Sequence, residues 1–250
     1  MGSVSNFKEQ IMMGKLFVKS KKFTYHLLFA ENGIKRMLEI APKSYISLSF
    51  GKQSNCLAHL IYQIDKTVPM FFLASEETWD MHNYRDVVSD FRKLCPDAKL
   101  NIIQTENFYS GEHKTWKESR DAGQFDLQRM CNPDEWDGWF WGLSTDESNM
   151  RRKTLLERNP GKQYHESIYQ YSSGKYRCCP IMKWDILMLA AYIWLNDIPL
   201  LDVYKKYGLT QRTTARLTKK SIDNNSLGYI KSMGGQGYNK ISNKFKVLNI

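Results

Sequence analysis

"SYISLSFGKQSNCLAHLIYQI", residues 44–64, is the stretch that decides the fold of this chain. Residues 45–49 form a strand-like run, and a tight glycine turn follows at residues 50–53. Apolar side chains then recur at helical spacing from about residue 54 to 64, so the sequence predicts a strand, a turn and a helix in direct succession.

The same alternation continues downstream of this stretch. Apolar runs at residues 68–75, 99–105 and 138–143 predict further strands, and the first two are separated by a helical pattern at residues 83–95. Strands that alternate with helices are typical of right-handed βαβ units. We therefore expect an α/β fold: a parallel, twisted sheet with helices on both faces.

The ends of the chain have a different pattern. Residues 1–22 are predicted to form an N-terminal arm or helix, and a helix over residues 25–41 precedes the first strand. Residues 23–180 would form the α/β domain. Residues 181–250 would be a helical, basic C-terminal extension, with two helices between residues 183 and 209 broken near Pro199.

The turn after the first strand has the chemistry of a phosphate site. In open parallel sheets, ligands bind beyond the carboxyl ends of the strands, where a helix N-terminus offers free N–H groups. Ser49 and Ser54 supply hydroxyl groups, Gly51 allows close approach of the backbone, and Lys52 adds positive charge. The alternative is an ordinary turn in which Ser54 caps the helix. Neither a Walker A motif nor G-x-G-x-x-G is present.

Four stretches, in order, resemble the phosphoadenosine phosphosulfate (PAPS) reductase family and its ATP-pyrophosphatase (PP-loop) relatives. They span roughly residues 40 to 217: "SFGKQS", "FFLASEET", "WFWGLSTDESNMRRK" and "YRCCPIMKWDILMLAAYIWLNDIPLLDVYKKYGL". The first is similar to the S-x-G-K-D-S pyrophosphate loop, and the third to a strand followed by G-[LI]-R-x-x-E-S-x-x-R. The resemblance implies an adenine-nucleotide alpha-hydrolase-like fold.

The resemblance also implies roles for individual residues. Catalytic roles would fall to Lys52, Glu147 and Arg151. The nucleotide would be bound by two groups of residues at the strand ends and by one arginine of a C-terminal lid, Arg212 or Arg216. The nucleotide-binding residues that the resemblance implies are Ser49, Phe50, Gly51, Lys52, Gln53, Ser54, Leu73, Ala74, Ser75, Gly142, Arg151, Arg152 and Arg216.

Two positions depart from the family pattern. Gln53 replaces an acidic loop residue, and an amide cannot hold Mg²⁺ as a carboxylate does. Ser144 stands where the family often has arginine. Reductase members also carry a C-terminal catalytic cysteine, whereas no cysteine follows Cys179, so we expect a member that is not a reductase.

Cysteine and histidine usage predicts no metal centre. The chain has 5 cysteines, of which only Cys178 and Cys179 are adjacent, and no C-x-x-C pair occurs. Buried structural thiols are therefore favoured over an iron–sulfur cluster, which needs about four thiolates. His59 is interpreted as a packed histidine. The acidic pairs Glu76-Glu77 and Asp146-Glu147 follow strands and are candidates for magnesium binding or base catalysis.

Composition narrows the class of partner. Lys and Arg exceed Asp and Glu by 36 to 26, a formal net charge of +10. This excess of positive charge is compatible with a polyanionic partner, and it is equally compatible with a basic surface that is evenly solvated. The number of cysteines is odd, and the sequence shows neither a secretory segment nor an apolar run long enough to cross a membrane. These features favour a cytoplasmic location. A helix-turn-helix-like stretch at residues 200–220 keeps nucleic acid binding open.

The function expected from the sequence is that of an ATP pyrophosphatase. It would bind ATP, or another adenine nucleotide such as PAPS, with Mg²⁺, adenylate an acceptor and release pyrophosphate. Two alternatives stay open: a sulfonucleotide-binding or sulfur-transfer component in nucleic-acid modification, and a non-catalytic, nucleotide-sensing DNA-binding regulator. A protein partner that supplies missing chemistry, and an oligomer, are compatible with each of these.

Overall fold

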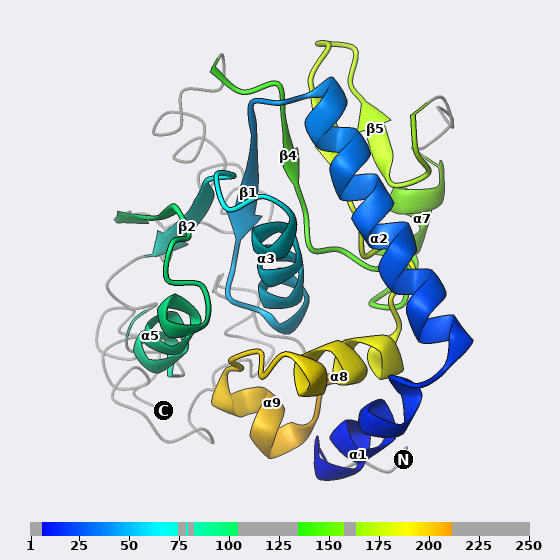
Figure 1. The fold of residues 1–250 in the computed structure, drawn as a ribbon, viewed down its shortest axis with the longest axis vertical. Coiled ribbons are helices and arrows are strands. Elements are labelled where there is room, and N and C mark those ends of the chain that lie inside the picture. The colour runs from blue at the N-terminus through cyan, green and yellow to red at the C-terminus, as the bar shows by residue number, and fades with distance from the viewer. Residues whose placement is uncertain (1–6, 75–78, 80–82, 105–134, 158–163, 212–250) are drawn as a thin grey trace, which may run out of the picture.

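The computed structural model describes residues 7–74, 79, 83–104, 135–157 and 164–211. In chain order its helices and strands are α1 (Phe7–Phe17), α2 (Lys21–Ile40), β1 (Ser44–Leu48), α3 (Lys52–Ile64), β2 (Met70–Ala74), α5 (Tyr84–Leu94), β3 (Leu100–Gln104), β4 (Gly138–Phe140), α7 (Asn149–Glu157), β5 (Ile168–Gln170), β6 (Tyr176–Cys178), α8 (Ile186–Leu195) and α9 (Asp202–Tyr207) (Figure 1).

The strands form a six-stranded sheet in the order β3-β2-β1-β4-β6-β5. Each neighbouring pair is parallel except β5 and β6, which form an antiparallel pair at one edge. The predicted α/β fold with a parallel sheet is therefore confirmed. The sequence analysis missed the β5–β6 pair, because strands of three residues are too short to show a period.

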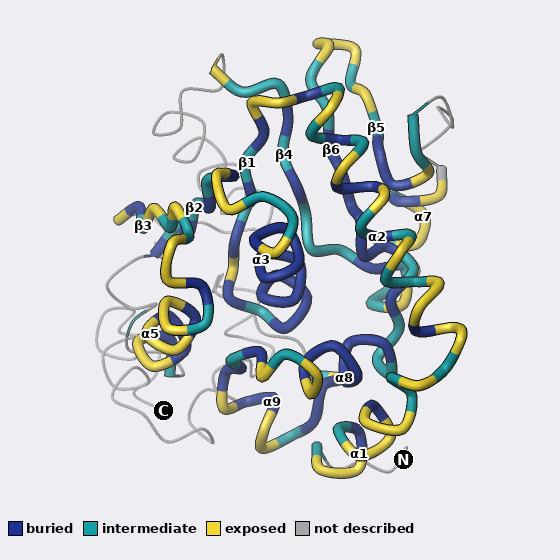
Figure 2. Tube along the Cα trace, viewed as in Figure 1, coloured by how far each residue is buried: buried dark blue, intermediate teal, exposed yellow. Residues whose placement is uncertain are grey.

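Three helices pack on one face of this sheet. Side chains alternate between the two faces of a strand, so Ile46 and Phe72 point to the same side. The ring of Phe72 stacks on Tyr84 of α5, and a Cβ at Gly138 would meet Met37 of α2. Together with α3, these helices cover the apolar face, as the dark tube in Figure 2 shows.

The opposite face of the sheet is aromatic. Tyr45, Phe71 and Trp139 project there, and Tyr45 contacts both of the other rings. The guanidinium of Arg177 lies over the Trp141 ring at 5.4 Å and donates to the Tyr171 hydroxyl at 3.1 Å. This face is half-buried, whereas the face beneath the helices is almost fully buried.

The order of the strands fixes where a ligand can bind. From β1 the chain moves through α3 to β2 and through α5 to β3, and it then returns to place β4 on the other side of β1. The direction of the strand order therefore reverses between β1 and β4. In open α/β sheets the crevice at such a switch point is where ligands bind.

The terminal helices pack together below the sheet (Figure 1). Gly14 of α1 lies so close to α8 that a Cβ there would approach the Ala190 carbonyl carbon to 2.5 Å. Gln10 accepts a hydrogen bond from the Leu209 N–H at 2.7 Å, so α1 also holds the segment after α9. The predicted break near Pro199 is confirmed, and Asp197 takes a left-handed conformation there.

Helix boundaries follow from capping side chains. Ser20 accepts from the Phe23 N–H at 3.1 Å, so α2 begins at Lys21, ahead of the predicted start at residue 25. Asp185 caps α8 in the same way through the Met188 N–H at 2.8 Å. The proposed limits of the N-terminal arm and the C-terminal extension stay predictions, although α8 shares its hydrophobic core with the sheet.

Candidate functional site at the carboxyl end of the first strand

The β1–α3 corner contains a strained residue. Phe50 has φ of 53°, a left-handed conformation that is unusual for a residue with a Cβ. Its ring is fully buried, with Phe72 at 4.8 Å and Phe91 at 5.6 Å between ring centroids. The buried ring thus anchors the turn, and the strain it maintains is of the kind that clusters at ligand sites.

Two serines brace the corner from within. The Ser54 hydroxyl accepts a hydrogen bond from the Ser49 N–H at 2.9 Å, and the Ser49 hydroxyl accepts from the Gly51 N–H at 3.4 Å. Gly51 is the N-cap, and α3 begins at Lys52. The alternative in which Ser54 caps the helix is therefore wrong. With its oxygen held, the Ser54 hydroxyl hydrogen remains a donor for a ligand.

Lys52 is a buried cation at this corner. Its side chain is 3% exposed, and Nζ donates to the backbone carbonyl of Gln211 at 2.9 Å. Nζ also lies 5.0 Å from the centroid of the Tyr204 ring. The ammonium group is consequently directed into the site by residues from the C-terminal third of the chain.

Gln53 and Asn55 carry buried polar atoms that lack partners. Gln53 is 6% exposed, and its Nε2 donates no hydrogen bond. Asn55 donates to the Pro199 carbonyl at 2.9 Å, but its Oδ1 is likewise unpaired. A buried donor without an acceptor costs about 1–3 kcal/mol. Such an unpaired donor on a cavity wall marks a place where an acceptor from a ligand would fit.

Gly142 brings the loop after β4 against the first turn of α3. A Cβ at this position would lie 2.9 Å from Ser54 Cα and 3.0 Å from Ser54 N. No side chain fits between these two segments without displacing one of them. Glycine is therefore required because two backbones meet there, and the same contact places the β4 loop beside the phosphate corner.

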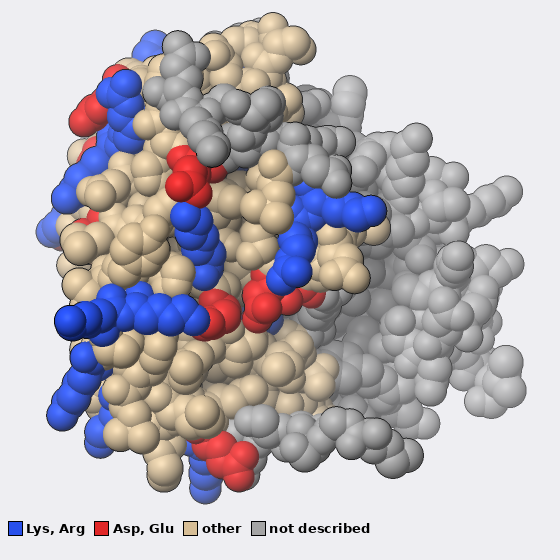
Figure 3. Space-filling view, turned by 90° about the vertical axis from the view of Figure 1, so that its right-hand side faces the viewer, with Lys and Arg blue, Asp and Glu red and all other residues tan. Residues whose placement is uncertain are grey.

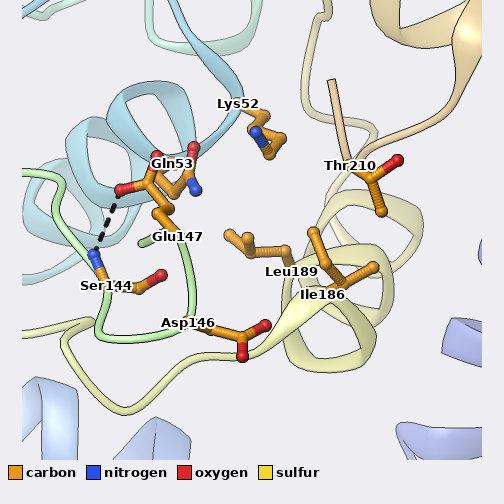
Figure 4. Close-up of a pocket in the computed structure, with 8 residues that line it drawn as sticks. All are labelled: Lys52, Gln53, Ser144, Asp146, Glu147, Ile186, Leu189 and Thr210. Carbon is orange, nitrogen blue, oxygen red and sulfur yellow. Dashed lines mark hydrogen bonds between the residues drawn. The ribbon is translucent and has the colours of Figure 1, made fainter. Parts of the chain in front are cut away.

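The loop between β4 and α7 carries an ion pair. Glu147 pairs with Arg151 one helical turn later and also accepts from the Ser144 N–H at 3.4 Å. In Figure 4, Glu147 points toward Ser144, whereas Asp146 is directed toward α8. Arg151 and Glu147 therefore stand together at the cavity, and the predicted place of Arg151 beside a phosphate stays a prediction.

Two adjoining cavities lie at this corner, with volumes of about 180 and 160 Å³. Lys52, Gln53 and Glu147 line both of them. The first extends toward α8 and Thr210, as Figure 4 shows, and the second toward the serines of the loop, Gly142 and Arg151. The site is thus a polar crevice at the switch point of the sheet.

The structure gathers most of the predicted site residues around these cavities. Those that line them are Ser49, Gly51, Lys52, Gln53, Ser54, Gly142, Asp146, Glu147 and Arg151. Arg152 is exposed and the Phe50 ring is in the core, so neither side chain lines a cavity. Leu73 and Ala74 lie at the end of the neighbouring strand β2, and their role beside a base stays a prediction. Ser75, Glu76, Glu77, Arg212 and Arg216 lie outside the described residues.

Sequence reasoning missed three contributors to the site. Tyr204, Thr210 and the Gln211 carbonyl reach Lys52 or its cavity from more than 150 positions away in the chain. The family-like Tyr and Gly-Leu positions in the fourth motif were the available signal. No local period could have placed them against the first helix, because the contact depends on how α8 and α9 fold back.

Described cysteines behave as structural thiols. Cys56, Cys95, Cys178 and Cys179 are free and buried. Burial raises the pKa of Cys179 to about 11 and that of Cys95 to about 12, so both stay protonated near neutral pH. Cys178 contacts the Ser167 hydroxyl at 3.4 Å. Over the described residues, no group of three or more His, Cys, Asp or Glu side chains is placed to hold a metal ion.

His59 is a packed histidine, as the sequence analysis interpreted it. It is 4% exposed, and Nδ1 lies 2.9 Å from the Tyr192 hydroxyl. Burial lowers the pKa of His59 to about 4, so the ring is neutral at physiological pH. Its place in the middle of α3, away from both cavities, gives it a structural role.

Positive charge is dispersed over the face shown in Figure 3. Basic side chains are spread across it, and acidic side chains lie beside several of them. Among the described residues, Lys183 pairs with Glu166 at 2.7 Å and Arg36 with Glu39 at 2.7 Å. This face fits an evenly solvated basic surface. Within the described residues, no helix is long and apolar enough to cross a membrane.

Comparison with known proteins identifies the family. Residues 43–236 match the model of the phosphoadenosine phosphosulfate reductase domain, which is well over half of the chain. The chain belongs to the PAPS reductase domain family. The match spans the β1–α3 corner, the β4 loop and the helices that direct Lys52, so the site described above lies wholly within the family domain.

Two solved structures are similar to this chain. One is PAPS reductase from Candida auris in a phosphate complex, with 16% identity, a TM-score of 0.47, and coverage of 78% of this chain and 89% of that one. The other is the U34-tRNA thiolase NcsA from Methanococcus maripaludis with its [4Fe-4S] cluster, with 12% identity, a TM-score of 0.47, and coverage of 88% and 78%. No curated protein matches the chain.

Proposed function

We propose that this chain binds an adenine nucleotide with the phosphoryl groups at the β1–α3 corner, and that it transfers the adenylyl group to an acceptor with release of pyrophosphate. One observation carries the proposal: a buried amide donor, Gln53 Nε2, is unpaired beside the buried ammonium of Lys52 at the N-terminus of α3. Membership of the PAPS reductase domain family supports an adenine nucleotide as the ligand.

The donors at this corner match the acceptors of a phosphate chain. Phosphoryl oxygens accept hydrogen bonds and carry negative charge, and a helix N-terminus favours both. Lys52, Gln53 and Ser54 each present a donor from the first turn of α3. The Gln211 carbonyl now held by Lys52 Nζ would give way to a phosphoryl oxygen, which is the stronger acceptor for an ammonium group.

The expected reaction is an in-line displacement at the α-phosphorus. A nucleophilic atom of the acceptor forms a bond to that phosphorus, and the bond from phosphorus to the bridging oxygen of pyrophosphate breaks. Negative charge grows on the departing pyrophosphate, where Lys52 and the α3 N–H groups would stabilise it. Glu147 acts as a positioning residue, because its carboxylate holds the Arg151 guanidinium at the edge of the cavity.

Of the two described carboxylates that line the cavities, Asp146 and Glu147, the second is already engaged, so a magnesium ion here would also need oxygen ligands from the substrate phosphates. Glu147 is engaged by Arg151 and by the Ser144 N–H, and Gln53 replaces the loop carboxylate with an amide. Mg²⁺ is ordinarily bound by one or two carboxylates together with substrate phosphates. The proposed reaction therefore depends on no metal held by the protein alone, and titration with Mg²⁺ in the presence and absence of ATP tests the predicted use of the ion.

A second candidate is favoured by the same glutamine. An amide donor binds a sulfate or phosphate oxygen directly, so the corner would also accept the phosphosulfate of PAPS. In that case the chain would be a sulfonucleotide-binding or sulfur-transfer component. The described cysteines offer no exposed thiol for reduction. The regulator alternative depends on residues after Gln211, which lie outside the described residues.

One assay distinguishes the two candidate functions. Purified chain is incubated with ATP or PAPS, Mg²⁺ and a panel of acceptors that includes tRNA, DNA and small amines, and pyrophosphate, AMP and thio-products are measured. Pyrophosphate from ATP that depends on Lys52, with Lys35→Met as the matched surface control, supports adenylyl transfer. Tight binding of PAPS without any pyrophosphate supports the second candidate. Failure to bind either nucleotide would refute both.

A further inference from the structure

A third cavity lies away from the β1–α3 corner, between α5 and the edge strand β3. Its volume is about 500 Å³, and its lining residues are Trp79, Arg85, Val88, Ser89, Arg92, Lys93 and Ile102. We call this cavity the α5–β3 groove. In Figure 1, α5 and β3 lie at the same end of the sheet, away from β4, α7 and α8.

The groove combines three kinds of surface in one place. Val88 and Ile102 give it an apolar floor, and the half-buried Trp79 indole forms an aromatic wall. Arg85 and Arg92, two helical turns apart on α5, add exposed positive charge at the rim. This combination matches the chemistry of a nucleotide unit, which has a flat apolar base and an anionic phosphate.

Charge is segregated around α5. Asp86 and Asp90 occupy the same helix but do not line the groove. Lys93 is paired with Asp90 at 2.8 Å, so its charge is partly neutralised. Over the part of the chain that the structure describes, neither Arg85 nor Arg92 forms an ion pair with a carboxylate. Within those residues, no carboxylate offsets the charge of Arg85 and Arg92, so the rim of the groove can bind an anion.

Trp79 is already covered by a cation. The Arg85 guanidinium lies 5.5 Å from the Trp79 ring centroid, and the indole Nε1 donates to Gln104 at 3.5 Å. A base that stacked on this ring would be flanked by the guanidinium, and a guanidinium binds phosphate in a bidentate manner. Only an unpaired base can present its face to an aromatic side chain, which favours a single strand over a duplex.

We infer that the α5–β3 groove binds single-stranded nucleic acid, with a base on Trp79 and neighbouring phosphates on Arg85 and Arg92. The inference does not depend on which nucleotide occupies the β1–α3 corner. Trp79 of the groove and Phe50 of the corner both pack on Phe72, at 5.9 and 4.8 Å between ring centroids.

Fluorescence anisotropy with a labelled single strand tests the inference. The probe is an oligonucleotide of about 12 residues, and the salt concentration is varied from about 50 to 200 mM. Arg85→Gln/Arg92→Gln should weaken binding by about tenfold or more and make the salt slope shallower by about 1.4, because two phosphate contacts are lost. The matched control is Lys19→Gln/Lys35→Gln, which removes two exposed charges elsewhere.

A second variant tests stacking. Trp79→Leu should weaken binding of the single strand by at least about fivefold, whereas Trp79→Phe should retain most of the affinity. An equal loss of affinity in Arg85→Gln/Arg92→Gln and in Lys19→Gln/Lys35→Gln would overturn the inference. Heparin binding as tight as that of the single strand, together with no effect of Trp79→Leu, would also overturn it. So would the absence of binding by the wild-type chain at the lowest salt. Circular dichroism and retained nucleotide binding at the corner establish that each variant is folded.

Discussion

The two halves of α3 treat buried polar groups in opposite ways. In the first turn, Gln53 and Asn55 are buried and each retains an atom without a partner. In the body of the helix, His59 is equally buried but contacts Tyr192 and Gln63. On the proposed function, this contrast separates a residue available to a ligand, Gln53, from a residue that serves packing, His59, on one continuous helix.

The body of α3 should control stability alone. Ile61 is fully buried in the main core, so Ile61→Ala should lower the free energy of unfolding by about 2–5 kcal/mol through lost burial and a cavity. Nucleotide affinity of the folded fraction should not change. Urea unfolding and calorimetric titration measure the two quantities. A loss of affinity as large as the loss of stability would erase the contrast between the halves.

The buried histidine should make stability depend on pH. Unfolded histidine takes up a proton near pH 6.5, whereas burial holds the pKa of His59 at about 4 in the folded chain. The unfolded state therefore binds more protons between these values, and stability falls as the pH drops from about 6.5 to about 4. The loss due to this residue is at most about 3 kcal/mol.

Unfolding of His59→Gln across the same pH range isolates this contribution. The variant should be less stable than wild type at neutral pH, because it loses the packed ring. Its stability should fall less steeply as the pH drops, since the side chain no longer titrates. Parallel pH curves for the two proteins would show that His59 is not responsible for the loss.

The first turn should control affinity instead. Lys52→Met should weaken binding of a nucleoside triphosphate by about 2 kcal/mol, or about thirtyfold, because a charged hydrogen-bond donor is lost. Stability should change by less than about 1 kcal/mol, since the methionine keeps the apolar stem. The control is Lys66→Met just beyond the helix, where the lysine is exposed and pairs with Asp97. Equal affinities of the two variants would contradict the assignment.

A change at Gln53 should move stability and nucleotide affinity in opposite directions, although both changes are small. Gln53→Leu removes a buried donor without a partner, so stability should rise by about 1 kcal/mol while nucleotide affinity falls about fivefold. Gln63→Leu on the same helix is the matched control for affinity alone, because Gln63 lies away from both cavities but contacts His59 at 3.3 Å. Loss of stability in Gln53→Leu would show that the amide has a structural role.

The sequence was sufficient for features that depend on local period. The strand, turn and helix of residues 44–64 were predictable because apolar spacing changes abruptly at Gly51. Family motifs also placed Gly142 and Glu147 beside the phosphate loop, which the cavity lining shows.

Features that depend on distant contacts were not predictable. The Phe50 conformation is set by core rings on β2 and α5, and the direction of Lys52 is set by Tyr204 and Gln211. Glu147 and Arg151 were identified together through the E-S-x-x-R motif, but their ion pair became evident only with the α7 helix in place.

Binding of ATP compared with adenosine tests the central claim most directly. Titration calorimetry on the wild-type chain should give at least about tenfold tighter binding of ATP, because the corner contacts the phosphoryl groups and adenosine has none. That preference should largely disappear in Lys52→Met. Equal affinity for ATP and adenosine in the wild-type chain, or a preference that survives Lys52→Met, would contradict a phosphate site at the β1–α3 corner.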